Sequence, residues 1–238
     1  MMKVPGKVAA VRIAEIYLSI QGEGLLTGCE SVFVRTSGCN LRCWFCDTPF
    51  ASWNPEGEDL SCAEIVEQVL SHGCRYVVIT GGEPMLWSEL VPLTAALSER
   101  GQHITIETAG TLYLPVHCNL LSLSPKLGNS APDRRRHPRW HVRHEQTRHA
   151  PQVVRRLIRE YPYQVKFVVD RPQDFAEVQA YLDSMPEIDR SRVMLMPQGT
   201  NPDELAARAA WLKPYCERTG LRYCPRKHIE WFGLVRGT

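Results

Sequence analysis

The sequence lacks a long hydrophobic run and carries almost no net charge. None of its apolar stretches approaches the roughly 20 residues that a membrane helix requires. The formal net charge of +2 over 238 residues gives no electrostatic reason to expect a nucleic-acid partner. The segment from Met1 to Arg12 has two lysines but lacks the apolar core of a secretory signal. We therefore predict a cytoplasmic protein that binds neither membrane nor nucleic acid.

The sequence also lacks a paired cysteine framework, although it contains nine cysteines. An odd number of scattered cysteines argues against a disulfide scaffold. The content of 44% hydrophobic and 23% charged residues is that of an ordinary globular protein. Six of the cysteines are interpreted most simply as small core residues or free thiols. These six are Cys29, Cys62, Cys74, Cys118, Cys216 and Cys224.

Apolar runs alternate with helical patterns along most of the chain. Ser61, with Glu64 three residues later, predicts one helix start because the pair can form a capping box. Other helices are expected to begin near residues 90, 151, 174 and 202. Runs rich in β-branched and aromatic residues predict six strands. These are residues 31–35, 76–80, 103–107, 119–123, 163–169 and 192–196.

This alternation predicts an α/β protein with a parallel sheet. Six strands are too few for a closed eight-stranded barrel, so we expect a partial, open TIM-like (β/α)6 barrel. We expect one domain over residues 1–238, with a core of about 16–200 and a C-terminal helix and tail at 201–238. Ligands of such folds bind at the carboxyl ends of the strands. Three distinctive features fall at such ends: a cysteine-rich loop, Gly81-Gly82-Glu83 and Met196-Pro197-Gln198-Gly199.

The cysteine-rich loop offers three thiols, Cys39, Cys43 and Cys46, in a C-x3-C-x2-C spacing. A closed zinc site or an ordinary iron–sulfur cluster takes four protein ligands, so three leave one metal position open. A structural zinc with a distant fourth ligand such as Cys29 or Cys62 remains an alternative. A redox pair of Cys43 and Cys46 would leave Cys39 unexplained. An iron–sulfur cluster uses all three, and an open metal position indicates an enzyme.

One segment breaks the alternation, because residues 133–149 contain six arginines and four histidines among Pro and Trp. We interpret this segment first as a solvated, flexible loop, since charge runs are usually exposed. A lid over an anionic ligand is the alternative. A nucleic-acid arm is a weak interpretation, because the run is short and the chain is nearly neutral.

The cysteine loop, with Phe45 before its last cysteine, resembles that of the radical S-adenosylmethionine (SAM) superfamily. Thr80-Gly81-Gly82-Glu83-Pro84 resembles the superfamily's glycine-rich strand end, which meets the methionyl amine of SAM. The resemblance implies a 4Fe–4S cluster at Cys39, Cys43 and Cys46, whose open iron is filled by SAM. It also implies reductive cleavage of SAM to a deoxyadenosyl radical, consistent with a low-potential cluster.

Motifs outside that core are similar to those of the 7-carboxy-7-deazaguanine synthase family. They are Ser19-Ile20-Gln21-Gly22-Glu23-Gly24, Phe33-Val34-Arg35, Gly38 to Cys43, Cys46-Asp47-Thr48, Ser124-Pro125-Lys126 and Asn129-Ser130. The resemblance covers about residues 16–199. It implies ring contraction of 6-carboxy-5,6,7,8-tetrahydropterin to 7-carboxy-7-deazaguanine and ammonia, in queuosine and 7-deazapurine biosynthesis. It further implies Mg2+, a homodimer and an electron donor of the flavodoxin or ferredoxin type.

The resemblance also implies which residues bind each group, and it assigns no catalytic side chain. Thr48 is expected to bind Mg2+, for which a hydroxyl oxygen is a suitable donor. Arg35 can pair with the substrate carboxylate in a bidentate manner. The segment 196–199 is expected to line the adenine, and Glu107 is expected either to hydrogen-bond the nucleoside or to be a paired strand-end carboxylate. The expected SAM contacts are Phe45, Cys46, Asp47, Gly82, Glu83, Ser124, Pro125 and Lys126, and the expected substrate contacts are Ile20, Gln21, Gly22, Glu23, Arg35, Thr80 and His228.

Two other functions remain as alternatives. An activating enzyme for glycyl-radical proteins would share the cluster loop and the glycine-rich strand end. Its peptide substrate gives no reason for Gln21, Glu23 and Arg35. A zinc-binding module without chemistry is the alternative from a different class.

Overall fold

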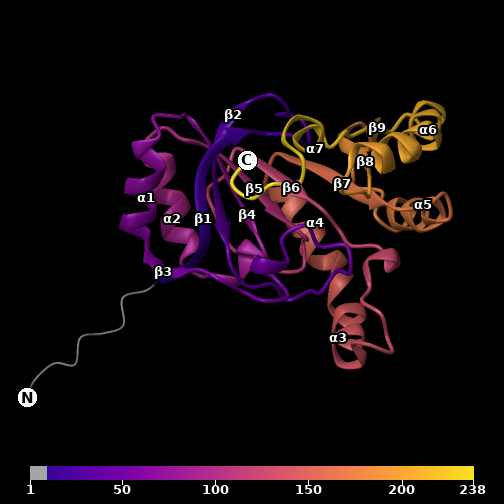
Figure 1. The fold of residues 1–238 in the computed structure, drawn as a ribbon, viewed down its shortest axis with the longest axis horizontal. Helices are drawn as coiled ribbons and strands as arrows, with labels where there is room; N and C mark the ends of the chain where they lie inside the picture. Colours follow the sequence, from indigo (N-terminus) through magenta and orange to yellow (C-terminus); the bar gives the residue numbers. More distant parts are fainter. Residues whose placement is uncertain (1–9) are drawn as a thin grey trace, which may run out of the picture.

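The computed structural model describes residues 10–238, and these residues build one curved sheet covered by helices (Figure 1). The sheet has nine strands in the order β3-β1-β2-β4-β5-β6-β7-β8-β9. The sheet does not close on itself, which confirms the predicted open, partial barrel. The segment Met1 to Arg12, which the sequence indicates is not a secretory signal, lies largely outside the described residues.

The six predicted strands are confirmed as the parallel centre of the sheet. Each of them pairs in parallel with the next one along the chain. They are β2 (Glu30–Thr36), β4 (Tyr76–Gly81), β5 (His103–Thr108), β6 (Leu120–Leu123), β7 (Tyr163–Val169) and β8 (Val193–Pro197).

Three strands were not predicted. β1 (Ala10–Ile20) runs antiparallel to β2, and β3 (Glu58–Ser61) runs antiparallel to β1. The two-residue strand β9 (Arg222–Tyr223) continues the sheet beyond β8. β1 therefore begins ahead of the predicted core boundary at residue 16, and part of the predicted tail belongs to the sheet.

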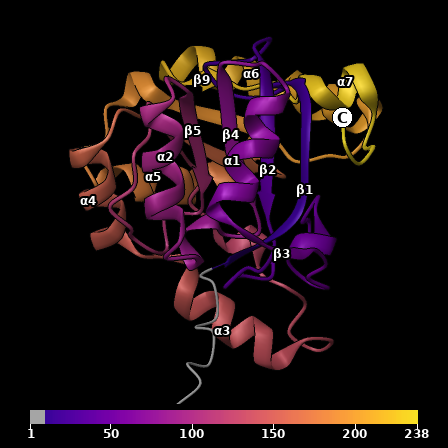
Figure 2. The same cartoon turned by 90° about the vertical axis from the view of Figure 1, so that its left-hand side faces the viewer.

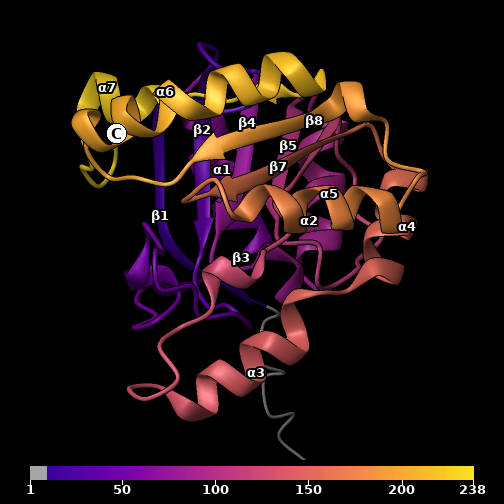
Figure 3. The same cartoon turned by 90° about the vertical axis from the view of Figure 1, so that its right-hand side faces the viewer.

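Helices cover the convex face of the sheet, with α1 and α2 over one half (Figure 2) and α5 and α6 over the other (Figure 3). The predicted capping box of α1 is present, because Ser61 and Glu64 bond reciprocally. The predicted helices are α1 (Cys62–Ser71), α2 (Leu90–Glu99), α4 (Pro151–Glu160), α5 (Asp174–Ser184) and α6 (Pro202–Thr219). A short helix, α7 (Lys227–Phe232), lies near the C-terminus.

The prediction of a flexible loop at 133–149 was wrong, because residues Pro138–Arg148 form helix α3. α3 protrudes at the end of the molecule opposite α6 (Figures 2 and 3). It has no apolar stripe that could have revealed it. Its one buried side chain is a histidine, His144, whose contacts are described below.

The central strands divide their side chains between two faces, as the period of two requires. In β2, for example, Val32 and Val34 belong to the hydrophobic core under the helices, whereas Phe33 and Arg35 line a cavity on the concave face. β4, β6 and β7 alternate in the same way. The concave face is therefore free to carry polar side chains.

Two further expectations concern the surface and the cysteines. No helix within residues 10–238 combines the length and apolar character needed to cross a bilayer. All nine cysteines are free thiols, and of the six interpreted as core or free thiols only Cys216 and Cys224 are fully buried.

Candidate functional site

A cavity of about 500 Å3 opens on the concave face at the carboxyl ends of the parallel strands. All of the predicted site residues line it except Glu83 and Pro125. They come from β1, β2, β4, the cysteine loop, the loops after β1, β4 and β6, and α7. Segments far apart in sequence thus meet at one place, as the positions of the strand ends predicted.

The cysteine loop follows β2 directly, and its three thiols face the cavity. Cys39 Sγ accepts a hydrogen bond from the Leu41 N–H at 3.4 Å, and Cys46 Sγ lies 3.1 Å from Ser52 Oγ. Within residues 10–238, no three His, Cys, Asp or Glu side chains converge where a single metal ion could bind. The thiols therefore line the cavity without forming a site for one zinc ion.

Burial raises the pKa of both Cys39 and Cys43 to about 12. These thiols are therefore protonated and unreactive in the metal-free chain, since only the thiolate is nucleophilic. Binding of an iron cluster would displace those protons and supply the positive charge that the thiolates need. Three soft sulfur donors on one wall of the cavity fit an iron–sulfur cluster, whose iron atoms each take their own thiolate.

Helix α3 holds the cysteine loop from outside. The backbone N–H of Arg42 donates to His144 Nδ1 at 3.2 Å, and His144 Nε2 lies 2.9 Å from Ser130 Oγ. The guanidinium of Arg42 stacks on Trp140, 3.9 Å from its ring centroid, and donates to the Cys39 carbonyl. The loop is thus fixed at a residue between its first two cysteines.

The glycine-rich end of β4 is needed for packing. A Cβ on Gly81 would lie 2.1 Å from the Thr36 carbonyl oxygen, and one on Gly82 would lie 1.9 Å from that of Gly38. The two glycines therefore let β4 pack against the start of the cysteine loop. Glu83 is fully buried, and its carboxylate accepts from Thr108 Oγ1 and the N–H groups of Ala109 and Met85. Its side chain braces the end of β5 and does not face the cavity.

The end of β6 brings a cation into the cavity. Lys126 Nζ donates to the carbonyl and hydroxyl oxygens of Ser124, at 2.8 and 2.7 Å. Both residues line the cavity, whereas Pro125 between them does not. Met196 and Gln198, from the end of β8, also line the cavity, as expected for the predicted nucleoside segment.

The loop after β1 presents a carboxylate, Glu23, that three basic residues surround. Lys166 and Arg226 form ion pairs with it, and His228 Nδ1 lies 3.8 Å away. Burial itself raises the pKa of Glu23, but the charges of Lys166 and Arg226 outweigh burial, so the pKa lies well below its usual range. Glu23 is therefore ionised and can only accept hydrogen bonds.

The charged network extends across the floor of the cavity. Lys166 lies 3.6 Å from Glu107, which accepts from Thr80 Oγ1 at 2.7 Å. Arg226 pairs with Asp47 of the cysteine loop. Glu107 is thus a paired strand-end carboxylate, and the network joins the substrate-side and cofactor-side residues that the sequence predicted.

Arg35, from β2, also lines the cavity and is also paired. Its Nε donates to Glu15 at 2.6 Å, and its NH2 group donates to the Tyr17 hydroxyl at 2.7 Å. Arg236, in the C-terminal tail, binds the other oxygen of Glu15 at 3.1 Å. β1 and the tail therefore set the position of Arg35.

The remaining predicted residues contact their neighbours as follows. The Gln21 side-chain amide donates to Ser31 Oγ at 2.8 Å, so its carbonyl oxygen is left for a ligand. Gly22 lies against His228, since a Cβ there would be 2.4 Å from the His228 nitrogen. Thr48, Ile20 and Phe45 line the cavity wall.

Sequence reasoning missed several groups that line the cavity. Lys166 is a lone charge in the apolar strand 163–169, which was its only signal. Arg226 and the tail from Gly233 to Thr238 carry no local signal, yet they line the same cavity. The tail therefore forms part of the wall, which the sequence left undecided.

Comparisons with known proteins agree with this geometry. The Radical SAM superfamily model matches residues 33–127, which include the cysteine loop, Gly81-Gly82 and Lys126. The chain is 46% identical over 231 residues to 7-carboxy-7-deazaguanine synthase of Rhodopirellula baltica, covering 97% of this chain and 90% of that protein. It is 40% identical over 234 residues to the protein of the same name from Halobacterium salinarum, covering 94% and 91%.

A solved structure shares the fold. The crystal structure of QueE from Escherichia coli superposes with a TM-score of 0.70, covering 92% of this chain and 95% of that one. The two sequences are 23% identical, so this likeness supports the fold alone.

Proposed function

Because the chain belongs to the 7-carboxy-7-deazaguanine synthase family of radical SAM enzymes, we propose that its cavity contracts the ring of 6-carboxy-5,6,7,8-tetrahydropterin. The products are 7-carboxy-7-deazaguanine and ammonia. The observation that carries the proposal is the meeting of almost all predicted contacts in one cavity. Neither alternative, a glycyl-radical activating enzyme or a zinc module, is the family to which the chain belongs.

Enzymes of this family use a 4Fe–4S cluster and SAM. We assign the cluster to Cys39, Cys43 and Cys46. When bound, the two groups supply one-electron chemistry that removes a hydrogen atom from the substrate. The tight packing of Gly82 against Gly38 leaves no space between the end of β4 and the start of the cysteine loop.

SAM would lie between the cysteine loop and the ends of β4 and β6. Lys126 is the nearest cation for its carboxylate, since the Lys126 ammonium can turn from Ser124 toward a ligand. Phe45, Asp47 and Gly82 line the same part of the cavity. Glu83 would act through the backbone of its segment, because its carboxylate is held by Thr108 and Ala109.

The substrate would lie between Glu23 and Arg35. The ionised Glu23 and the free carbonyl oxygen of Gln21 suit the amino and lactam N–H donors of the pterin. Arg35 supplies a guanidinium for the substrate carboxylate. Thr80 and His228 line the space between these groups.

Thr48 is our candidate ligand for Mg2+. Mg2+ usually keeps several waters and takes only one or two protein ligands beside its substrate. Thr48, with a single hydroxyl oxygen on the cavity wall, is sufficient as the protein ligand of such an ion, so converging carboxylates are not required. The substrate carboxylate would be a second ligand of Mg2+.

Three parts of the proposal concern the surroundings of the enzyme. We retain the prediction of a cytoplasmic protein, which the nine free cysteines support because thiols persist in reducing compartments. We also retain a homodimer, and a flavodoxin- or ferredoxin-like donor. The donor is required by the chemistry, since the cluster must receive an electron from outside.

Anaerobic reconstitution tests the proposal. Protein loaded with iron and sulfide should be brown, bind about four irons, and convert the carboxy-tetrahydropterin to the deazaguanine with SAM, Mg2+ and a reductant. Cys43→Ala should bind little iron and cleave no SAM. Absence of the deazaguanine from fully loaded wild-type protein would refute the assignment, and colourless zinc protein would refute radical chemistry altogether.

A further inference from the structure

Five exposed arginines form a basic surface on and before α3. We call these residues, Arg134, Arg135, Arg136, Arg139 and Arg143, the α3 arginine patch. Among the described residues none of the five takes part in an ion pair, whereas Arg148 at the end of α3 pairs with Glu145 and Glu177. The segment 133–149 holds six arginines against two acidic residues, while the whole chain has a net charge of only +2. Positive charge is therefore concentrated in this segment.

The α3 arginine patch is fixed to the cysteine loop. His144 is fully buried and accepts from the Arg42 N–H, and it also bonds Ser130. Trp140 of the same helix lies against the Arg42 guanidinium, and the Trp53 ring packs at a tilt against His137. The Trp53 indole N–H donates to the Cys43 carbonyl at 2.9 Å. A solvated surface helix would not need these contacts. The helix is positioned against the loop that holds the thiols.

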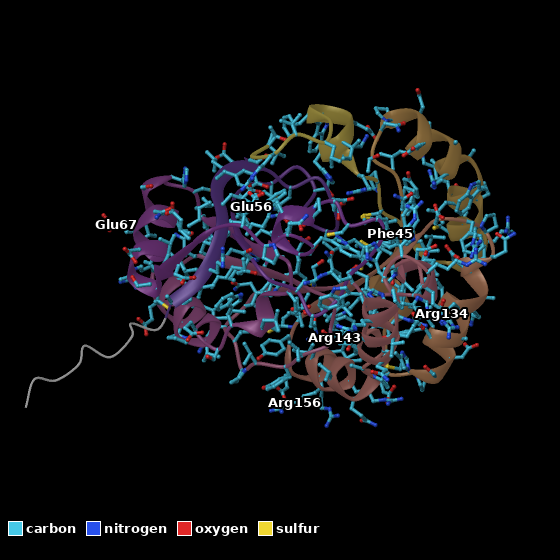
Figure 4. All side chains as sticks on the ribbon, turned by 60° about the horizontal axis from the view of Figure 1, so that its bottom comes forward. Phe45, Glu56, Glu67, Arg134, Arg143 and Arg156 are labelled. Carbon is cyan, nitrogen blue, oxygen red and sulfur yellow. The ribbon has the colours of Figure 1, made fainter. Side chains whose placement is uncertain are left out.

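The cysteine loop itself reaches the surface beside the patch. Trp44, which follows Cys43, is 51% exposed, and its indole N–H donates to the Asn129 carbonyl at 2.7 Å. Phe45, Arg134 and Arg143 all come into view when the lower end of the molecule is turned forward (Figure 4). Cys43 is thus directly followed by an exposed residue of the loop that α3 contacts.

We propose that the α3 arginine patch is the docking surface for an acidic one-electron carrier protein that reduces the cluster. This inference rests on the proposed function, because it needs a cluster at the three cysteines. The carrier loses one electron and the cluster gains it, with no bond made or broken. Complementary charge raises the association rate of such partners by about 10- to 1,000-fold and fixes their orientation.

A nucleic acid is the other polyanion that five arginines could attract. It would gain nothing from contact with the cysteine loop, and the rest of the chain has no excess positive charge to extend the surface. A carrier must approach the thiols closely, and the contacts between α3 and the cysteine loop place the arginines beside that loop.

A charge-reversal pair tests the proposal against a matched control. The test variant combines Arg139→Glu with Arg143→Glu. The control variant combines Arg218→Glu with Arg222→Glu, in α6 and β9, at the end of the molecule opposite α3. The two variants change the net charge equally. The measurement is the second-order rate constant for reduction of the reconstituted cluster, followed by bleaching of its visible absorption. The reductants are a reduced flavodoxin of net negative charge and photoreduced deazariboflavin, a small uncharged one.

With flavodoxin, the α3 pair should lower the rate constant at least about tenfold at low ionic strength, and added salt should slow the wild type toward the variant. Deazariboflavin should reduce both proteins equally, which also shows that the variant folds and holds its cluster. Equal flavodoxin rates in the two variants would overturn the proposal, as would loss of rate in the control pair alone. Tight binding of a short RNA to the α3 arginine patch of wild type would also count against the proposal, because it would assign the patch to a nucleic acid.

The test separates this inference from the proposed function. Formation of the deazaguanine with deazariboflavin as reductant depends on the cavity and not on the patch. If wild type makes no product but the two variants differ with flavodoxin, the substrate assignment fails and the docking surface stands.

Discussion

Acid should destabilise this fold through one buried histidine, His144. The side chain is fully buried, and the Arg42 N–H donates to its Nδ1. Since a backbone N–H can only donate, Nδ1 must accept, so the ring proton lies on Nε2 and is donated to Ser130 Oγ. A second proton on Nδ1 would break the bond to Arg42 and leave a charge in a dry site.

The size of the effect follows from the titration of the ring. Burial lowers the pKa of His144 from 6.5 to about 4. Between these two values the unfolded chain binds more protons than the folded one, so stability falls as pH falls. The difference corresponds to about 3 kcal/mol, at about 1.4 kcal/mol per pH unit. This contribution is complete above the unfolded pKa and is lost as the pH approaches about 4.

Urea unfolding of the iron-free protein, followed by tryptophan fluorescence, measures this loss. His144→Gln keeps an acceptor and a donor but does not titrate in the range. Between neutral pH and about pH 4.5, its unfolding free energy should fall by about 2–3 kcal/mol less than that of wild type. His72→Gln, at an exposed position, should follow the wild-type curve. Parallel curves for wild type and His144→Gln would refute the assigned tautomer and its burial.

Three further variants test the cavity. Arg35→Ala leaves Glu15 without one of its partners and should weaken pterin binding by about 2 kcal/mol, roughly thirtyfold. The iron content and the cleavage of SAM without substrate should stay at wild-type levels. An unchanged dissociation constant for the pterin would show that Arg35 does not bind the substrate. Gly82→Ala puts a Cβ 1.9 Å from the Gly38 carbonyl oxygen, so the loop must move and iron retention should drop; normal iron content would contradict this. Lys166→Met removes one of the two ion-pair partners of Glu23, while Arg226 remains, and should lower the unfolding free energy by about 1–3 kcal/mol, which urea unfolding at neutral pH checks.

The parallel strands could be predicted because each is a nearly continuous apolar run bounded by turn residues. Residues 77–80 and 120–123 of two such runs are buried on both faces, so these runs stand out without any knowledge of register. Because both faces of these strands are buried, the sequence does not indicate which face lines the cavity. β1 was missed because its alternation of apolar and polar residues is irregular, with a bulge between Ile13 and Glu15.

α3 could not be predicted from periodicity. A surface helix normally reveals itself by an apolar stripe, whereas this one is held by a buried histidine and by Trp140 against Arg42. Both contacts reach residues about 100 positions earlier in the chain. A charged segment without an apolar stripe is therefore predicted as a loop when its tertiary contacts are unknown.

The candidate site also contains residues that could be predicted from the sequence and residues that could not. Cys39, Gly82 and Lys126 lie in motifs with fixed local spacing, and such motifs were sufficient to place them at one edge of the sheet. Lys166 and Arg226 have no local motif, since both pair with Glu23, more than 100 positions earlier in the chain. A buried lysine is tolerable only with such partners, so its role cannot be stated before the fold is known.

Those two cations decide how the cavity can bind a substrate. Lys166 and Arg226 keep Glu23 ionised, so that part of the wall can accept hydrogen bonds but cannot donate from its carboxylate. Arg35, steadied by Glu15, offers only donors. A molecule with N–H groups at one end and a carboxylate at the other is therefore bound in one direction, because reversing it would place carboxylate against carboxylate. Glu23 and Arg35, which fix this orientation, lie in the family motifs, whereas the residues that set their charge and position, Lys166, Arg226 and Glu15, do not.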